Sequence, residues 1–168
     1  RDIGLNRVIT FGIDLKWRKK VIEMVKKTNP KYILDVATGT GDLAIAMADS
    51  DAEKIIGLDI SAGMLQVGKN KIQKKKLNKR IEMVQADSEN LPYPDHTFDA
   101  ITVAFGVRNF ENLDKGLSEI YRVLSPGGLF VILETSVPTK FPFKQGYKVY
   151  SNYILPNIGK LFSKDKSA

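Results

Sequence analysis

The sequence predicts an α/β fold in which a doubly wound, mainly parallel sheet carries helices on both faces. Apolar runs of strand length alternate with helix-like segments between residues 32 and 134, a pattern typical of parallel sheets. The first of these runs leads directly into a glycine-rich turn at residues 37–41, and glycine there lets backbone approach a ligand. The 168 residues fit one domain.

Five apolar runs are predicted to form the strands, at residues 32–36, 54–58, 81–85, 98–103 and 128–134. Helices are predicted over residues 42–49, 61–75 and 113–124, with Ser61 and either Asn112 or Asp114 as N-caps. A proline-glycine turn at residues 125–128 should separate the last helix from the fifth strand.

An amphipathic helix is predicted over residues 16–27, ending before Pro30. Its buried side should carry four apolar residues, namely Trp17, Val21, Met24 and Val25.

Composition excludes several classes of function. The chain has no cysteine and one histidine, His96, so neither disulfides nor a zinc or iron site are expected. His96 precedes the fourth strand and should be a turn residue at the amino edge of the sheet. The sequence shows neither an apolar run of about 20 residues nor a signal peptide, so a cytoplasmic protein is expected.

The net charge of +7 is concentrated in two segments, around residues 16–27 and 69–80. Two interpretations of this charge stay open. The basic residues form solvated helix faces, or they attract an anionic membrane or nucleic acid. Aromatic residues do not alternate with the lysines near residue 75. Stacking on bases is therefore not favoured, and no nucleic-acid partner is expected.

The glycine turn contains Gly39 and Gly41 and satisfies the G-x-G-x-x-G/A pattern of dinucleotide-binding proteins. Asp35 and Asp42 flank this turn, and their charges would repel a pyrophosphate. They would favour S-adenosylmethionine, which lacks phosphate and carries a sulfonium and an ammonium group. The turn therefore predicts a methyl donor as the cofactor.

Acids also follow the second and third strands, at the edge where ligands of such sheets bind. Asp59, followed by Ile60, is placed to accept both ribose hydroxyls, although it could instead cap the next helix. Asp87 could accept the adenine amine and the Ser88 N–H could donate to a ring nitrogen, although Asp87 is also a common turn residue.

The fourth strand leads into Arg108 and Asn109, beside a glycine-relaxed turn and facing the place where the methyl group would lie. Both side chains can donate to a substrate oxygen. Pairing of the arginine with a surface acid is the alternative.

The motifs at residues 35–41, 59, 91–95, 105–109 and 121–128 resemble those of class I S-adenosylmethionine-dependent methyltransferases. More narrowly, residues 6–17, the Phe-Gly-x-Arg-Asn segment at 105–109, and residues 134–138 leading to 153–156 are similar to the ubiquinone/menaquinone biosynthesis C-methyltransferases. The similarity covers essentially the whole chain.

This resemblance implies a Rossmann-like sheet of the class I methyltransferase type, lacking its last two strands in a truncated chain. It divides the chain into an N-terminal helical cap (1–30), a donor-binding core (31–137) and a substrate lid (138–168). The family's cofactor contacts correspond here to Thr38, Asp59, Asp87 and Ser88. Some members have a serine where this chain has Ala104.

The resemblance also implies methyl transfer to a ring carbon of a prenylated quinol, either demethylmenaquinol or the benzoquinol of the ubiquinone pathway. Arg108 would stabilise phenolate charge, with Asn109 positioning the ring; Arg108 as the base is the second choice. Aromatic residues would line a channel for the lipid tail or form core under a lid: Phe105, Phe110, Phe141, Phe143, Tyr147 and Tyr150.

Peripheral contact with the inner membrane face through the basic N-terminal helix, and a homodimer, are further expectations. Two other readings stay open. One is a class I methyltransferase acting on another small molecule or on RNA. The other is a non-catalytic protein that binds the donor or nucleic acid.

Overall fold

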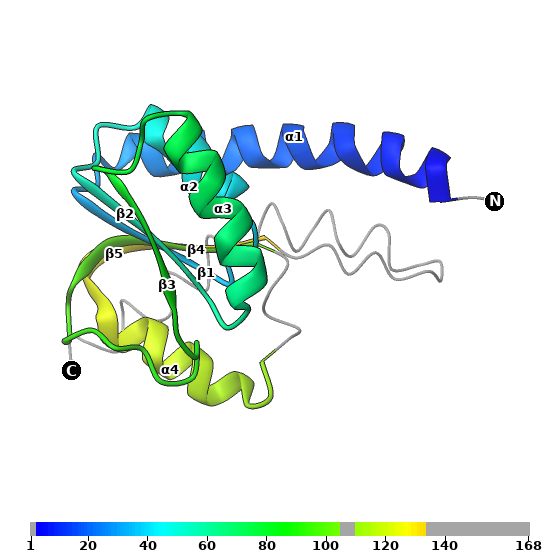
Figure 1. Ribbon diagram of the computed structural model, residues 1–168. Coiled ribbons are helices and arrows are strands. Elements are labelled where there is room, and N and C mark those ends of the chain that lie inside the picture. Colours follow the sequence, from blue (N-terminus) through cyan, green and yellow to red (C-terminus); the bar gives the residue numbers. More distant parts are fainter. Residues whose placement is uncertain (1–2, 105–109, 134–168) are drawn as a thin grey trace, which may run out of the picture.

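The computed structural model describes residues 3–104 and 110–133, with side chains of the first helix from residue 15 onward (Figure 1). The helices are α1 (Ile3–Lys27), α2 (Asp42–Ala46), a short 3-10 turn η1 (Met47–Asp49), α3 (Ala62–Lys74) and α4 (Leu113–Val123). The strands are β1 (Tyr32–Val36), β2 (Lys54–Asp59), β3 (Ile81–Gln85), β4 (Phe98–Ala104) and β5 (Leu124–Leu133). The predicted α/β fold is confirmed.

The five strands form one parallel sheet in the order β3-β2-β1-β4-β5. The chain moves outward from β1 through β2 to β3 and then returns to the other side of β1 as β4. Neighbouring crossovers therefore leave the sheet on opposite sides between β1 and β4, where a ligand crevice forms at the carboxyl ends of the strands.

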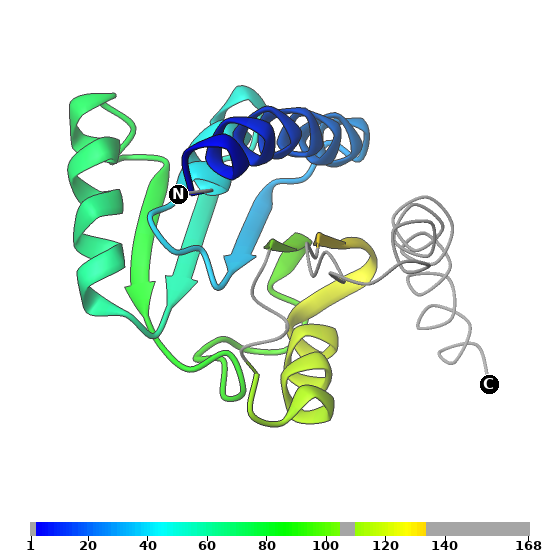
Figure 2. The same ribbon diagram turned by 90° about the vertical axis from the view of Figure 1, so that its right-hand side faces the viewer.

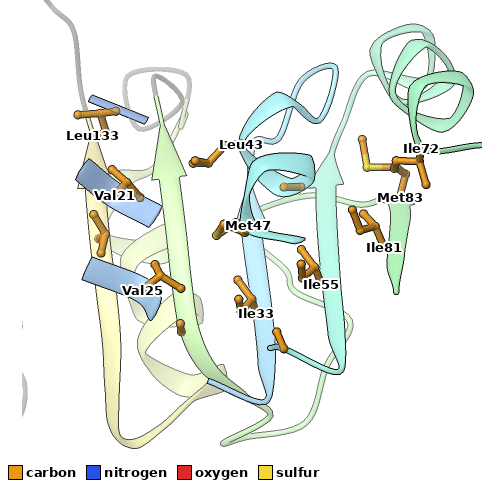
Figure 3. Packing of buried hydrophobic residues seen from close by; sticks show 14 of the residues in the cluster. Val21, Val25, Ile33, Leu43, Met47, Ile55, Ile72, Ile81, Met83 and Leu133 are labelled. Carbon is orange, nitrogen blue, oxygen red and sulfur yellow. The ribbon is translucent and has the colours of Figure 1, made fainter. Parts of the chain in front are cut away.

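Helices cover both faces of the sheet: α1, α2 and α3 pack on one face, and α4 packs on the other (Figures 1 and 2). The first face buries Val21 and Val25 of α1 with Leu43, Met47 and Ile72 (Figure 3). The second buries Ile120 and Val123 of α4 against the sheet. Because both faces of β1 are covered, its residues from Ile33 to Val36 are all buried.

Three elements differ from their predicted bounds by more than two residues. Helix α1 begins at Ile3 rather than at residue 16, because an established helix extends at little cost through a proline-free segment. The helix predicted over residues 42–49 is α-helical only to Ala46. The Arg80 guanidinium donates to the carbonyls of Ala48, Ser50 and Ala52, which holds the chain after this point in a tight turn.

Strand β5 begins at Leu124, directly after α4, instead of at residue 128. Leu124 already pairs with Phe98, and the next pair joins Leu129 to Ala100. The proline-glycine segment is therefore an irregularity inside β5 rather than a turn before it, and Gly127 there has a φ of 78°.

The segment before β4 is fixed to α4 by Arg122. Its guanidinium donates to the carbonyls of Leu91 and Tyr93 and pairs with Asp95 and Glu119. These acids raise the pKa of Arg122, and Arg122 lowers the pKa of Glu119. His96 lies in the same segment, with its N–H donating to the Arg122 carbonyl. It is thus at the amino edge of the sheet, as predicted.

The glycine turn after β1 is packed against one methionine. A Cβ added at Gly41 or Gly57 would lie 2.7 or 2.6 Å from the side chain of Met83, and a Cβ at Gly68 would also meet it. At Gly68 that Cβ would lie 2.9 Å from the carbonyl oxygen of Thr40 in the turn itself. The absence of side chains at these positions lets α3, β2 and the turn meet closely.

We expect Gly68→Ala to destabilise the protein by about 1–3 kcal/mol, because the backbone of α3 and the turn would have to separate. Gly63→Ala, in the same helix, is the matched control: nothing lies within 4 Å of a Cβ there, so higher helix propensity should add about 0.5–1 kcal/mol. Urea unfolding measures both changes. A Gly68→Ala variant as stable as the wild type would contradict this packing argument.

Candidate functional site

The turn between β1 and α2 adopts a conformation rich in left-handed residues. Ala37, Gly39 and Gly41 have φ angles of 54°, 59° and 82°. Left-handed backbone strains a residue with a Cβ, so Ala37 is held there by its surroundings. The turn is joined to the neighbouring strand because the Thr38 N–H donates to the Leu58 carbonyl at 2.9 Å.

Asp35 lies beneath this turn and is 2% exposed. Its Oδ2 accepts from the Thr38 hydroxyl and its Oδ1 from the Thr102 hydroxyl, each at 2.7 Å. Burial raises the pKa of Asp35 to about 6, although the two hydroxyls and the charge of Arg18 oppose this rise. The predicted cofactor residue is thus an interior carboxylate that fixes Thr38.

Asp59 ends β2 and connects two segments of the site. Its Oδ2 accepts from the Gly39 N–H at 2.8 Å, and its Oδ1 accepts from the Ser61 N–H at 2.9 Å. A carboxylate has about four acceptor positions, so each oxygen keeps room for one further donor. Ser61 caps α3 by accepting from the Met64 N–H, and so the capping and ligand-binding readings of Asp59 are compatible.

An apolar surface lies beside Asp59. Ile60 is 71% exposed and Met64 is 49% exposed. A Cβ at Gly39 would be 3.9 Å from Met64 Sδ, so the methionine side chain lies next to the glycine turn. Exposed aliphatic side chains at this edge suit the flat face of an aromatic ring.

Asp87 and Ser88 follow β3 at the same edge. The Ala86 N–H donates to the Asp59 carbonyl, which brings the ends of β2 and β3 together. Asp87 is exposed, and its Oδ1 accepts from the Glu89 N–H at 2.9 Å. Asp87 therefore acts as a turn residue, as one of its two interpretations predicted. Its Oδ2 accepts no hydrogen bond from a described residue.

A cavity of about 130 Å³ opens next to Asp35, at the carboxyl ends of β1, β4 and β5. Residues from five elements and the turn line it: Arg18, Asp35, Ala37, Thr38, Thr40, Asp42, Leu43, Ala104 and Leu133. Arg18 and Leu133 are not predicted as site residues from the sequence. The hydroxyl of Thr102, which donates to Asp35, is not predicted either, although the sequence holds a hint of it. Thr102 is a polar residue within an apolar strand, and it pairs in register with Asp35.

Asp42 does not contribute an unpaired charge to this site. The Lys71 ammonium lies 2.8 Å from its Oδ1 and 3.0 Å from the Thr40 hydroxyl. With Asp35 enclosed and Asp42 paired, the predicted repulsion of a pyrophosphate by both acids is weaker than the sequence suggested. Lys71 and Arg80 also show that the basic segment at residues 69–80 is more than a solvated face.

Arg108 and Asn109, the predicted catalytic residues, lie outside the described residues. The ends of their segment are described: Ala104 lines the cavity, and Phe110 packs against Gly116 of α4. Strand β4 therefore ends at the wall of the cavity.

Comparison with known proteins gives a family match over nearly the whole chain. The model of the ubiE/COQ5 methyltransferase family matches residues 2–168. A demethylmenaquinone methyltransferase from Bacteroides fragilis is 52% identical over 98% of this chain, which corresponds to 67% of the relative. A ubiquinone/menaquinone biosynthesis C-methyltransferase from Geotalea daltonii is 46% identical over 95% of the chain and 69% of the relative.

Among solved structures, a SAM-dependent methyltransferase from Aquifex aeolicus aligns with a TM-score of 0.63 and 26% identity, over 70% of this chain and 63% of that one. The chain thus spans about two thirds of the length of these relatives. The sheet order, the turn geometry and the sequence match agree, and the chain belongs to the ubiE/COQ5 methyltransferase family.

Proposed function

We propose that this protein transfers the methyl group of S-adenosylmethionine to a ring carbon of a prenylated quinol. The acceptor is demethylmenaquinol or the corresponding benzoquinol of the ubiquinone pathway. The observation that carries the proposal is the whole-chain similarity to demethylmenaquinone and ubiquinone/menaquinone methyltransferases.

The residues of the site fit S-adenosylmethionine. Asp59 holds its carboxylate at the end of β2 with acceptor positions left for two ribose hydroxyls. Ile60 and Met64 offer an apolar surface for the adenine ring, and Asp87 with Ser88 would hydrogen-bond its edge. The cavity beside Asp35 would take the amino-acid end, with the glycine turn in between.

S-adenosylmethionine supplies an electrophilic methyl group when bound. For transfer to carbon, a phenolic oxygen of the quinol must lose or share its proton so that the ortho carbon becomes nucleophilic. We propose that Arg108 stabilises the phenolate charge and that Asn109 orients the ring. The carbon–methyl bond forms as the sulfur–methyl bond breaks, and the ring proton then leaves to solvent.

The lipid tail of the acceptor needs an apolar surface and access to the membrane that stores it. We propose that the exposed residues Lys16, Lys19 and Lys20 of α1 make peripheral contact with that membrane, since each basic side chain near anionic lipid contributes about 1 kcal/mol. None of the helices that the structure describes has the length and apolarity needed to cross a bilayer.

Replacing Asp59 should weaken donor binding. We expect Asp59→Ala to lower the affinity for S-adenosylhomocysteine at least tenfold, about 1.4 kcal/mol, because charged hydrogen bonds to the ribose and the anchor of Gly39 are both lost. Isothermal titration calorimetry measures this change. Glu53→Ala, which removes an exposed acid at the opposite edge of the sheet, is the control and should bind normally. Unchanged affinity in Asp59→Ala would refute the assignment.

Asp35 should make stability depend on pH. Its pKa is raised from 3.8 to about 6 in the folded state, so the folded protein binds more protons than the unfolded one between these values. Stability from this group is complete below pH 3.8 and is lost as the pH rises through 6, by about 3 kcal/mol in all.

Asp35→Asn removes this contribution while keeping the shape of the side chain. Urea unfolding of both proteins at several pH values between 4 and 7 should therefore show the wild type losing stability relative to the variant. The comparison uses the pH dependence alone, so any constant change in hydrogen bonding to Thr38 and Thr102 cancels. A difference that stays constant over this range would contradict the buried-carboxylate argument.

The reaction itself is tested by turnover of a short-chain demethylmenaquinol with methyl-labelled donor. We expect Arg108→Ala to reduce kcat by about 100-fold or more, as removal of a group that stabilises developing charge does. Its affinity for S-adenosylhomocysteine should stay at the wild-type value. Wild-type protein that binds the donor but leaves the quinol unmethylated would refute the proposed acceptor.

A further inference from the structure

Arg18 belongs to the helix face that packs on the sheet. Val21 and Val25 on that face are 4% and 0% exposed, and Val21 lies toward Leu133 at the carboxyl end of β5 (Figure 3). Residues three apart in a helix share a face, so Arg18 follows this row one turn further toward the carboxyl ends of the strands. It is half-buried there and lines the cavity beside Asp35.

The other half-buried arginines of the described structure have structural partners. Arg80 donates four hydrogen bonds to backbone carbonyls, and Arg122 donates five to carbonyls and carboxylates. Arg18 donates to no residue within 15–104 or 110–133. A partly buried cation without a partner is costly, which suggests that its partner is a ligand.

The acids of the cavity do not serve as that partner. Asp35 is enclosed, and each of its oxygens already accepts a hydroxyl. Asp42 is paired with Lys71 on the other side of the turn. The charge of Arg18 still lowers the pKa of Asp35, which shows that the two groups lie near each other without a direct bond. The cavity therefore presents a positive group that bonds to none of the described residues, with a negative group near it.

A ligand group that carries both a positive and a negative charge fits the cavity between Arg18 and Asp35. The cavity volume of about 130 Å³ is equivalent to about four water molecules at ~30 Å³ each, enough for an amino acid's carboxylate and ammonium. The planar guanidinium matches a carboxylate with two parallel hydrogen bonds. Asp35 lies where it can attract the ammonium.

We propose that Arg18 binds the α-carboxylate of the donor's amino-acid end. This inference rests on the proposed function, because it assigns a subsite of the same cofactor. Arg18 thus makes α1 part of the binding site and confers selectivity for nucleosides that carry the amino acid.

Two probes separate this contact from the rest of the site. S-adenosylhomocysteine carries the amino-acid end, whereas 5′-methylthioadenosine has the same nucleoside and sulfur without it. We expect Arg18→Met to lower the affinity for S-adenosylhomocysteine at least tenfold and to leave the affinity for 5′-methylthioadenosine within twofold. Calorimetric titration with each probe measures both values.

Lys27→Met is the matched control, because it removes one positive charge from an exposed position of the same helix; it should bind both probes normally. Arg18→Lys keeps the positive charge but loses the planar guanidinium. Its affinity for S-adenosylhomocysteine should therefore lie between those of the wild type and Arg18→Met. Thermal unfolding of each variant verifies that α1 still packs. If Arg18→Met unfolds, Arg18→Lys carries the test, with a smaller loss of affinity that is again confined to S-adenosylhomocysteine.

Three outcomes overturn the inference. Wild-type affinity of Arg18→Met for both probes would show that the carboxylate is bound elsewhere. An equal loss for both probes would assign Arg18 a structural role. Wild-type protein that binds neither probe would refute the proposed function and this inference with it, whereas tight wild-type binding with an unchanged ratio refutes the inference alone.

Discussion

The hydrogen bond from the Gly39 N–H to the Asp59 carboxylate organises the rest of the site. It joins the turn after β1 to the end of β2, and the other oxygen of the same carboxylate holds the Ser61 N–H at the start of α3. One side chain therefore sets the relative positions of a turn, a strand end and a helix. Each oxygen of this carboxylate keeps an acceptor position for a ligand, so the same group can support the turn and bind the nucleoside.

This connection depends on close packing below the turn. Met83 fills the space left by glycines of the turn, of β2 and of α3, and a side chain at Gly68 would also meet the backbone of Thr40 and push α3 away from the turn. Asp35 adds a second support from the interior, since it fixes Thr38 and Thr102 at the expense of a raised pKa. The site is thus held from below by buried contacts.

Charge around the turn is more balanced than a count of acids suggests. Lys71 pairs with Asp42, and Arg18 lies near Asp35, so both signs are present within one small cavity. Such a cavity favours a zwitterion over a dianionic pyrophosphate because each charge of the ligand finds an opposite group. The preference for a methyl donor over a dinucleotide therefore follows from the pairing of charges rather than from repulsion alone.

The sequence by itself determined the five strands, the helix cap at Ser61, the glycine turn and the acids at the ends of β2 and β3, while the structure chose Asn112 over Asp114 as the cap of α4. These features are local: apolar periodicity and turn chemistry act over a few residues. Tertiary structure alone decided how far α1 extends, where β5 begins, and that Lys71 neutralises Asp42. It also brought Arg18 and Leu133 to the cavity beside Asp35, and Thr102 within hydrogen-bond distance of Asp35. The positions of these residues depend on the order of the strands and on the path of α1 across the sheet, and no short stretch of sequence encodes either one.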